Sequence, residues 1–219
     1  MDTPARLPAA LPDGLPAAPN GATEFFGAAY PIVERFGELL ATEGTIRGLI
    51  GPREVPNLWE RHLLNSAAVV QYLPTRGRLV DLGSGGGLPG IVVAAMRPDQ
   101  PVTLIEPMLR RTNWLSEVVT ALELTNVTVE RGRAEDLSGK ITATAITARA
   151  VAPLAKLLAW SRPLLAPRGE LIALKGANVA TEIPGDSELQ RAGWSAPQIH
   201  QAHILPGIAP TTVVQVCRR

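Results

Sequence analysis

The 219-residue sequence has few of the residues that build covalent cross-links or metal sites. A single cysteine, Cys217, excludes a disulfide framework and a cysteine-based zinc site. The histidines His62, His200 and His203 are scattered, so we expect no metal. No apolar run is long enough to span a bilayer, and no charged segment followed by an apolar one marks the N-terminus. We therefore expect a cytoplasmic protein without membrane contact. We also expect a monomer.

An excess of either charge is also missing. Lys and Arg total 21 against 20 Asp and Glu, which gives a net charge of +1 and no global attraction for polyanions. A nucleic-acid partner would have to be held by local clusters. Lysine occurs only at Lys140, Lys156 and Lys175, and the remaining basic residues are arginines, which suit bidentate contacts to phosphate. The length and the apolar content of 46% fit one domain with a sizeable core.

The N-terminal third of the chain differs from the rest. Residues 1–22 contain prolines at nearly every fourth position, which predicts a disordered tail (Pro4, Pro8, Pro12, Pro16 and Pro19). Residues 23–75 are expected to form a helical extension. Apolar residues at helical spacing predict one helix from Thr23 to Thr42, with a kink at Pro31, and a second from Leu58 to Tyr72.

Residues 76–219 show a different pattern, in which short apolar runs alternate with longer amphipathic segments. This alternation predicts an α/β domain with a mostly parallel sheet and helices on both faces. The runs LVDL (79–82), TLIE (103–106) and ELIALK (170–175) have little polar alternation, as expected for strands buried on both faces. No helix is predicted between the last two runs, at 197–204 and 211–219, so we expect an antiparallel hairpin at one edge of the sheet.

A glycine-rich loop, DLGSGGGLPG at 81–90, follows the first predicted strand and precedes a helix. Such a loop brings backbone N–H groups close to a ligand at a helix N-terminus. Gly85, Gly87 and Gly90 match the G-x-G-x-x-G pattern of dinucleotide sites, which is weak by itself. Asp81, two residues before Gly83, is typical of loops that bind S-adenosylmethionine. Its carboxylate suits a cationic amino acid and sulfonium and would repel a pyrophosphate, so the loop favours S-adenosylmethionine over NAD.

Two further segments are predicted to bind the same ligand. Glu106 ends the next strand, where a carboxylate accepts hydrogen bonds from ribose hydroxyls, a feature that both ligands share. Ala134 and Glu135 follow the third strand, where such folds hold an adenine edge. An exposed acidic helix start, capped by Asp136 or Ser138, explains the latter segment equally well.

The chemistry of the acceptor is narrowed by what the fourth strand lacks. A pyrimidine C5 methyltransferase needs a cysteine nucleophile, and Cys217 lies near the C-terminus instead. An Asn/Asp-Pro-Pro-aromatic segment, common in methylation of exocyclic amines, is absent from 146–153. What remains is an acceptor with a free lone pair, such as N7 of guanine, for which positioning supplies most of the catalysis. Arg149 is expected at the mouth of the site, on the cofactor, on guanine O6 or on a phosphate.

Basic residues outside the glycine loop are expected to flank the same mouth. Together they would form a phosphate-binding stripe, whereas each one alone is better explained as a solvated residue. The members of this stripe are Arg47, Arg53, Arg61, His62, Arg110, Arg111 and Lys175.

Six motifs in this order and spacing resemble the RsmG (GidB) family of bacterial methyltransferases over about residues 23–217. They are RHLLNS (61–66), DLGSGGGLPG (81–90), EPMLRR (106–111), GRAE (132–135), ARA (148–150) and ALKG (173–176). The resemblance implies a class I, Rossmann-like fold and S-adenosylmethionine-dependent methylation of N7 of a guanosine in the 16S rRNA of the small ribosomal subunit. In that family, loss of activity is associated with low-level streptomycin resistance.

The resemblance also implies roles for individual residues. Gly83 and Leu88 are expected to bind the methyl donor through the loop, Ala134 and Glu135 at its adenosine end, and Arg149 from the fourth strand. The first motif is expected on the rRNA-facing side of the site, which places Arg61, His62 and Ser66 there and makes His62, with Arg149, a candidate for catalysis.

The sequence departs from the family pattern in three places. Asn65 stands where the family usually has Asp, an Asn-Leu-Thr element is missing between Gly37 and Gly51, and 143–145 carry no Asp. Two alternatives stay open on the sequence alone. One is a methyltransferase for a small molecule or a protein, and the other is a nonenzymatic nucleotide-binding Rossmann module.

Overall fold

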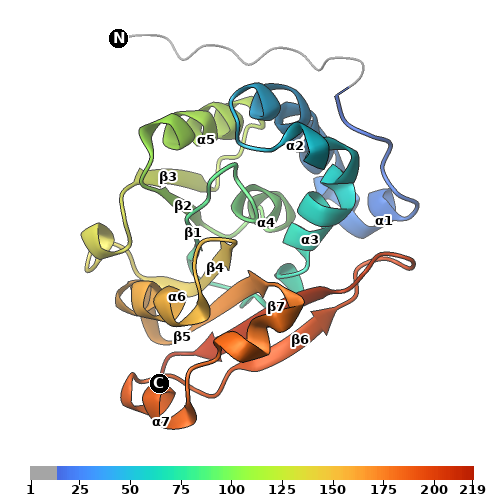
Figure 1. The fold of residues 1–219 in the computed structure, drawn as a ribbon. Helices are drawn as coiled ribbons and strands as arrows, with labels where there is room; N and C mark the ends of the chain where they lie inside the picture. The colour runs from blue at the N-terminus through green and yellow to red at the C-terminus, as the bar shows by residue number, and fades with distance from the viewer. Residues whose placement is uncertain (1–13) are drawn as a thin grey trace, which may run out of the picture.

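The computed structural model describes residues 14–219, which form a seven-stranded sheet covered by helices on both faces (Figure 1). The strand order is β3-β2-β1-β4-β5-β7-β6. The first five strands are parallel, whereas β7 is antiparallel to both β5 and β6. This confirms the predicted sheet and its edge hairpin. The strands are β1 Leu79–Leu82, β2 Val102–Glu106, β3 Val127–Arg131, β4 Ala143–Arg149, β5 Leu165–Lys175, β6 Gln198–Ala202 and β7 Thr211–Cys217.

The central strands are buried on both faces, as their apolar runs predicted. Successive residues of β1 point to opposite faces, so Leu79 packs in one hydrophobic core and Val80 in another. The first core contains the N-terminal helices, α4 and α5, and the second contains α6 and α7 (Figure 1). The α-helices are α1 Ala22–Phe26, α2 Tyr30–Leu39, α3 Asn65–Ala67, α4 Gly90–Met96, α5 Leu109–Ala121, α6 Leu154–Ser161 and α7 Asp186–Arg191.

The N-terminal helices form where they were predicted, with two differences in the first of them. The first segment is broken at Gly27, whose φ of 52° is unsuited to a helix, and it continues through α2 into a π-helical segment, Leu40–Gly44. Pro31 lies in the first turn of α2, where proline is tolerated, so the predicted kink at this residue is wrong. The second segment consists of a π-helical stretch, Leu58–Leu64, then α3, then a 3₁₀ turn, Val70–Tyr72.

Part of the predicted tail is packed against these helices. Leu15 is partly buried in the first core, and the indole Nε1 of Trp59 donates a hydrogen bond of 2.8 Å to the carbonyl of Pro16. The expected disorder of residues 1–22 is therefore wrong for residues 14–22, because tertiary contacts supply what the proline-rich segment cannot form locally. Residues 1–13 lie outside the described part of the chain.

No helix in the described part of the chain is long and apolar enough to cross a membrane.

Short 3₁₀ segments complete the structure. They are Gly27–Ala29, Pro52–Asn57, Glu135–Leu137, Arg162–Leu164 and Ala177–Glu182.

Candidate active site

The loop between β1 and α4 lies at the carboxyl edge of the parallel strands, the edge at which open α/β sheets bind their ligands. Its tight turn depends on glycine at Gly83, where φ is 73°. Gly90 is required for a different reason: a Cβ at this position would lie 2.3 Å from Leu104 and 2.7 Å from the Asp81 carboxylate. The start of α4 therefore packs directly on the sheet, and the loop has little freedom to move.

Asp81 holds this loop from behind and does not face the cavity. Its side chain is fully buried, accepts a 3.1 Å hydrogen bond from the N–H of Gly90 and accepts another of 3.1 Å from the Thr147 hydroxyl. Burial raises the pKa of Asp81 from 3.8 to about 6, although these hydrogen bonds oppose the shift. The expected contact between this carboxylate and a cationic ligand is therefore wrong, since Asp81 belongs to the second layer beneath the loop.

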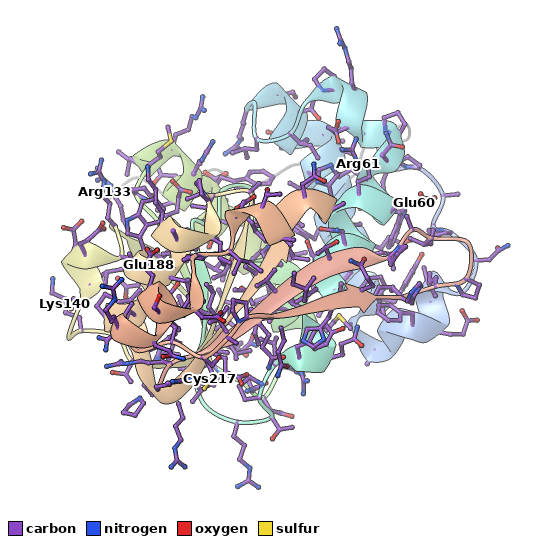
Figure 2. All side chains as sticks on the ribbon, turned by 60° about the horizontal axis from the view of Figure 1, so that its bottom comes forward. Glu60, Arg61, Arg133, Lys140, Glu188 and Cys217 are labelled. Atoms are coloured by element: carbon purple, nitrogen blue, oxygen red, sulfur yellow. The ribbon has the colours of Figure 1, made fainter. Side chains whose placement is uncertain are left out.

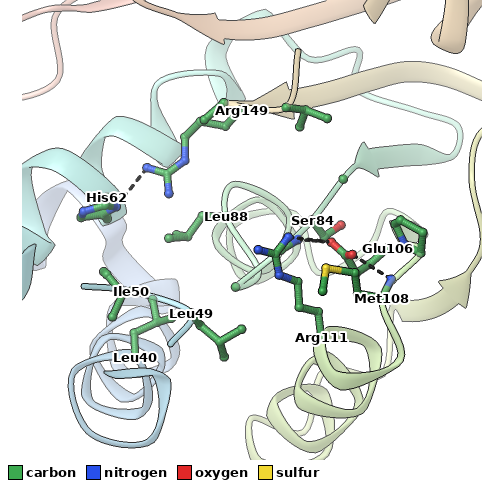
Figure 3. Close-up of a pocket in the computed structure, with 16 residues that line it drawn as sticks. Leu40, Leu49, Ile50, His62, Ser84, Leu88, Glu106, Met108, Arg111 and Arg149 are labelled. Carbon is green, nitrogen blue, oxygen red and sulfur yellow. Dashed lines mark hydrogen bonds and ion pairs between the residues drawn. The ribbon is translucent and has the colours of Figure 1, made fainter. Parts of the chain in front are cut away.

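Glu106, at the end of β2, is the acidic group that the cavity does present. Its Oε2 accepts a 3.0 Å hydrogen bond from the N–H of Gly85 and its Oε1 accepts one of 3.0 Å from the N–H of Met108. Arg111 lies 3.7 Å from Oε2 (Figure 3). These bonds fix the orientation of a carboxylate that is only 2% exposed, and each oxygen keeps a second lone pair for a ligand hydroxyl.

The cavity in front of the loop has a volume of about 360 Å³. Polar side chains lie on two sides of the cavity, with Glu106 and Arg111 on one side and His62 and Arg149 on the other, and an apolar wall lies between them (Figure 3). Leu40, Leu49 and Ile50 of the N-terminal helical region form much of the apolar wall. Gly87 lies outside the lining and instead packs on Phe36 and Ile91, so the expected ligand contact at Gly87 is replaced by a packing role.

A second cavity of about 350 Å³ adjoins the first and contains Ala134 and Glu135. The two cavities share Gly83, Pro107 and Val151, so an elongated ligand can extend from one into the other. Ala134 is buried, whereas Glu135 is exposed and begins a 3₁₀ turn. This arrangement places the predicted adenosine-end residues where a single ligand can reach both them and the glycine loop.

Arg149 ends β4 at the border of the first cavity and contacts the N-terminal helical region. Its Nη1 donates a 3.2 Å hydrogen bond to the carbonyl of Arg61 and one of 3.2 Å to Nδ1 of His62. Burial lowers the pKa of Arg149 to about 10, so the guanidinium remains charged at neutral pH. The next residue, Ala150, has a φ of 54°, a strained conformation of the kind often found at functional sites.

His62 is held between Arg149 and Glu54. The Glu54 carboxylate lies 3.1 Å from Nε2 of His62, on the opposite side of the ring from Arg149. Burial, followed by repulsion from Arg149, lowers the pKa of His62, whereas Glu54 opposes this shift. The neutral ring therefore donates from Nε2 to Glu54 and accepts at Nδ1 from Arg149.

The predicted phosphate-binding stripe is only partly formed. Arg61 is exposed on the N-terminal helical layer, where it pairs with Glu54 (Figure 2). Arg53 and Arg110 are also exposed. Arg111 lines the first cavity but pairs with Glu106, and Arg47 pairs with Glu43 and Glu117. Ser66 is fully buried and cannot contact RNA, so its predicted role is wrong.

Lys175 also differs from its predicted role. Its Nζ lies 2.6 Å from the carboxylate of Glu182 and donates a 3.1 Å hydrogen bond to the carbonyl of Ala152. Lys175 therefore ties the segment after β4 to the segment after β5 and offers little free charge to RNA. The pairing could not be read from the sequence, because Glu182 lies in a polar segment without a strong secondary-structure pattern.

Three features of the site were not predicted. They are the pairing of Glu54 with His62, the apolar wall from Leu40 to Ile50, and the position of Val151 between the two cavities. Only the apolar wall had a signal in the sequence, the apolar pair Leu49 and Ile50.

The fold and the site together define a class I S-adenosylmethionine-dependent methyltransferase fold. A methyltransferase structure from Aquifex aeolicus, named as dependent on this cofactor, is similar with a TM-score of 0.54 at 18% identity, covering 75% of this chain and 94% of that one. A precorrin-6y C5,15-methyltransferase from Geobacter metallireducens has a TM-score of 0.53 at 12% identity, covering 78% and 90%. At these identities the similarity concerns the fold alone.

Sequence comparison identifies the family. The GidB family model, described as rRNA small subunit methyltransferase G, matches residues 30–203. A protein named ribosomal RNA small subunit methyltransferase G from a Nocardioides species is 50% identical, over 92% of this chain and 81% of its own. One of the same name from Thermobifida fusca is 55% identical, over 75% and 69%. The chain belongs to the GidB family, which confirms the resemblance seen in its motifs.

Proposed function

We propose that this protein transfers the methyl group of S-adenosylmethionine to N7 of a guanosine in the 16S rRNA of the small ribosomal subunit. The observation that carries the proposal is the glycine loop with Glu106 at its mouth, in a chain that belongs to the GidB family. Relatives named for methylation of small-subunit rRNA support the substrate class.

The residues of the two joined cavities fit S-adenosylmethionine. Glu106 is positioned to accept hydrogen bonds from the ribose, and Ala134 with Glu135 lines the cavity into which an adenine extends. Arg111 and Arg149 provide positive charge for the amino-acid carboxylate. Leu88 and the glycines Gly83 and Gly85 form the floor of the first cavity.

The proposed reaction needs position more than proton transfer. When bound, S-adenosylmethionine supplies an electrophilic methyl group on a sulfonium centre. N7 of guanine carries a free lone pair, so no general base is required. The task of the protein is to exclude water, through the apolar wall, and to align the purine, through Arg149, whose guanidinium suits guanine O6.

The exposed arginines on the rim are proposed to contact rRNA phosphates. Arg53, Arg61 and Arg110 are exposed on the segments that border the first cavity. Phosphate contacts position a protein on RNA without reading its sequence, and they make binding sensitive to salt. We further propose that the protein acts as a monomer in the cytoplasm, where ribosomal subunits are found; light scattering and cell fractionation test these two points.

Two measurements test the function. In a thermal-shift assay, S-adenosylhomocysteine should stabilise the protein, whereas NAD should not. Small subunits from a strain that lacks the enzyme should then accept a labelled methyl group, and mass-spectrometric mapping should locate it on N7 of one guanosine. Stabilisation by NAD alone, or a methyl group on another RNA or on a protein, would contradict the proposal.

A further inference from the structure

A smaller hollow of about 200 Å³ adjoins the first cavity, shares no lining residue with the cavity that contains Glu135, and is called here the acceptor hollow. Its lining residues are Asn65, Arg149, Ala150, Leu174, Lys175 and Gly176. Arg149 and Ala150 line the first cavity as well, so the two spaces meet at the end of β4. The glycine loop and Glu106 line the first cavity but not the acceptor hollow, whereas Asn65 lines the acceptor hollow but not the first cavity.

We propose that the acceptor hollow holds the guanine that is methylated, with Asn65 reading its exocyclic N2 amine and Arg149 its O6. This inference rests on the proposed function, because it assigns a site to the acceptor of that reaction. It gives Asn65, which the sequence singled out only as a departure from the family pattern, a part in substrate specificity.

The charge of the acceptor hollow suits a neutral base better than a phosphate. Lys175 lies 2.6 Å from the carboxylate of Glu182 and is only 10% exposed, so its charge is compensated. Leu174 and Ala150 contribute apolar surface, and Gly176 has no side chain. Arg149 remains the cation of the lining without a carboxylate in an ion pair among the described residues. A planar, polar heterocycle matches such a site.

The hydrogen-bonding groups that face the acceptor hollow match guanine. The amide Nδ2 of Asn65 donates a 2.9 Å hydrogen bond to the Thr211 hydroxyl, which leaves Oδ1 as an acceptor without a partner among the described residues. Both hydrogen bonds of Arg149 to described residues use Nη1, so Nη2 remains a donor. Guanine offers the complement, with N2 as a donor and O6 as an acceptor. Adenine would place an amine against Arg149.

The order of these groups also places N7 toward the methyl donor. Around the guanine rim the sequence is N2, N1, O6 and N7. Along the site it is Asn65, then Arg149 at the junction, then the glycine loop. With N2 on Asn65 and O6 on Arg149, N7 is the atom nearest the first cavity. Transfer forms the bond from N7 to the methyl carbon and breaks the bond from that carbon to sulfur. The positive charge passes from sulfur to the purine, and no proton leaves.

A first test fills the acceptor hollow. Gly176 has ordinary backbone angles, φ −74° and ψ 167°, and a Cβ there would meet no atom within 4 Å. Gly176→Leu should therefore fold normally and bind S-adenosylhomocysteine as the wild type does, but it should transfer methyl groups at least about 100-fold more slowly, since small displacements of a reacting base are this costly. Gly185→Leu is the matched control, because Gly185 is equally open and lines neither space.

A second test probes the hydrogen bond of Asn65. Asn65→Leu should lower kcat/KM by about 10- to 100-fold, the value of a base-edge contact, and Asn65→Asp should lower it less because it keeps an acceptor oxygen. Inosine lacks the N2 amine. On subunits reconstituted with inosine in place of the target guanosine, wild type and Asn65→Leu should therefore be equally slow. If Asn65→Leu lowers kcat/KM by the same factor on guanosine and on inosine, the assignment of Asn65 is overturned.

The two proposals fail in different ways. If wild-type protein does not methylate unmodified small subunits, the proposed function is wrong. If it does, and Gly176→Leu is as active as Gly185→Leu, the function stands and the acceptor hollow is not where the base binds.

Discussion

Arg149 connects several parts of the site. It ends β4, borders both the first cavity and the acceptor hollow, and is hydrogen-bonded to Arg61 and His62 of the N-terminal helical region. Glu54 is hydrogen-bonded to the other side of His62, so His62 and Glu54 together fix the Arg149 guanidinium. Such support from neighbouring groups is what holds a reacting base within the narrow tolerance of catalysis.

Arg149→Ala should abolish methylation while leaving the fold intact. The loss should be at least about 100-fold in kcat/KM, because both the orientation of the base and the charge at the junction disappear. Thermal unfolding and methyl transfer to unmodified subunits measure the two effects separately. Arg131→Ala, on β3 outside the lining of either space, is the control. Wild-type activity in the Arg149 variant would remove this residue from the site.

Glu54 should set the acid limit of activity through His62. Protonation of His62 would place a proton on Nδ1, against the donor Nη1 of Arg149, so activity should fall as the pH drops through the pKa of His62, which lies below 6.5. Glu54 favours the protonated ring, so Glu54→Gln should move the acid limb of kcat/KM to lower pH. Profiles between about pH 5 and 8 measure this shift. A shift to higher pH would contradict the arrangement.

Asp81 should make the stability of the protein depend on pH. The folded state raises the pKa of Asp81 from 3.8 to about 6, so this carboxyl favours folding when it is protonated, and that contribution disappears as the pH rises through 6. In Asp81→Asn this dependence is removed. Between pH 4 and 8, the wild type should therefore lose about 1–3 kcal/mol of unfolding free energy relative to the variant. Urea unfolding at both pH values measures it, and parallel behaviour of the two proteins would refute it.

At the scale of elements, the strands and the glycine loop were predictable because their patterns are local. Runs such as LVDL, with little polar alternation, are typical of strands buried on both faces of a parallel sheet, and the spacing of Gly83 and Glu106 follows from one strand–loop–helix unit. The orientation of single side chains was not predictable. Asp81 turns under the loop because Gly90 N–H and Thr147 are there to bind it, and Thr147 lies on a strand far along the sequence.

Gly90, where the glycine loop joins α4, should not tolerate a side chain. Gly90→Ala would place a Cβ 2.3 Å from Leu104 and 2.8 Å from Cβ of Asp81, both on rigid strands. We expect a loss of about 1–3 kcal/mol in the free energy of unfolding and weaker binding of S-adenosylhomocysteine. Chemical denaturation and calorimetry measure these. Gly185→Ala, which meets no atom within 4 Å, should change neither, and an unaffected Gly90→Ala would show that the loop can relax.

At the scale of the whole molecule, the N-terminal layer is part of the methyltransferase body and not an appendage. Phe36 and Leu63 share one hydrophobic core with Leu104 and Trp114, and Leu40, Leu49 and Ile50 form a wall of the first cavity. The sequence predicted the helices of this layer but not their shared core with the sheet, because a helical pattern does not indicate which distant strand will pack on the apolar face of the helix. The same reason explains why the packed residues 14–22 looked like a disordered tail.

Residues 14–21 should therefore stabilise the whole protein through this layer. A chain that begins at residue 22 loses the contact of Leu15 with the first core and the hydrogen bond from Trp59 to Pro16. Relative to a chain that begins at residue 14, it should lose about 2 kcal/mol of unfolding free energy. The comparison isolates residues 14–21 because both chains lack residues 1–13. Since the same layer walls the first cavity, affinity for S-adenosylhomocysteine should fall as well. Equal denaturation midpoints of the two chains would show that this segment contacts the helices without stabilising them. Leu15→Ala in the full chain should reproduce about half of the loss, because it removes the packing and keeps the hydrogen bond.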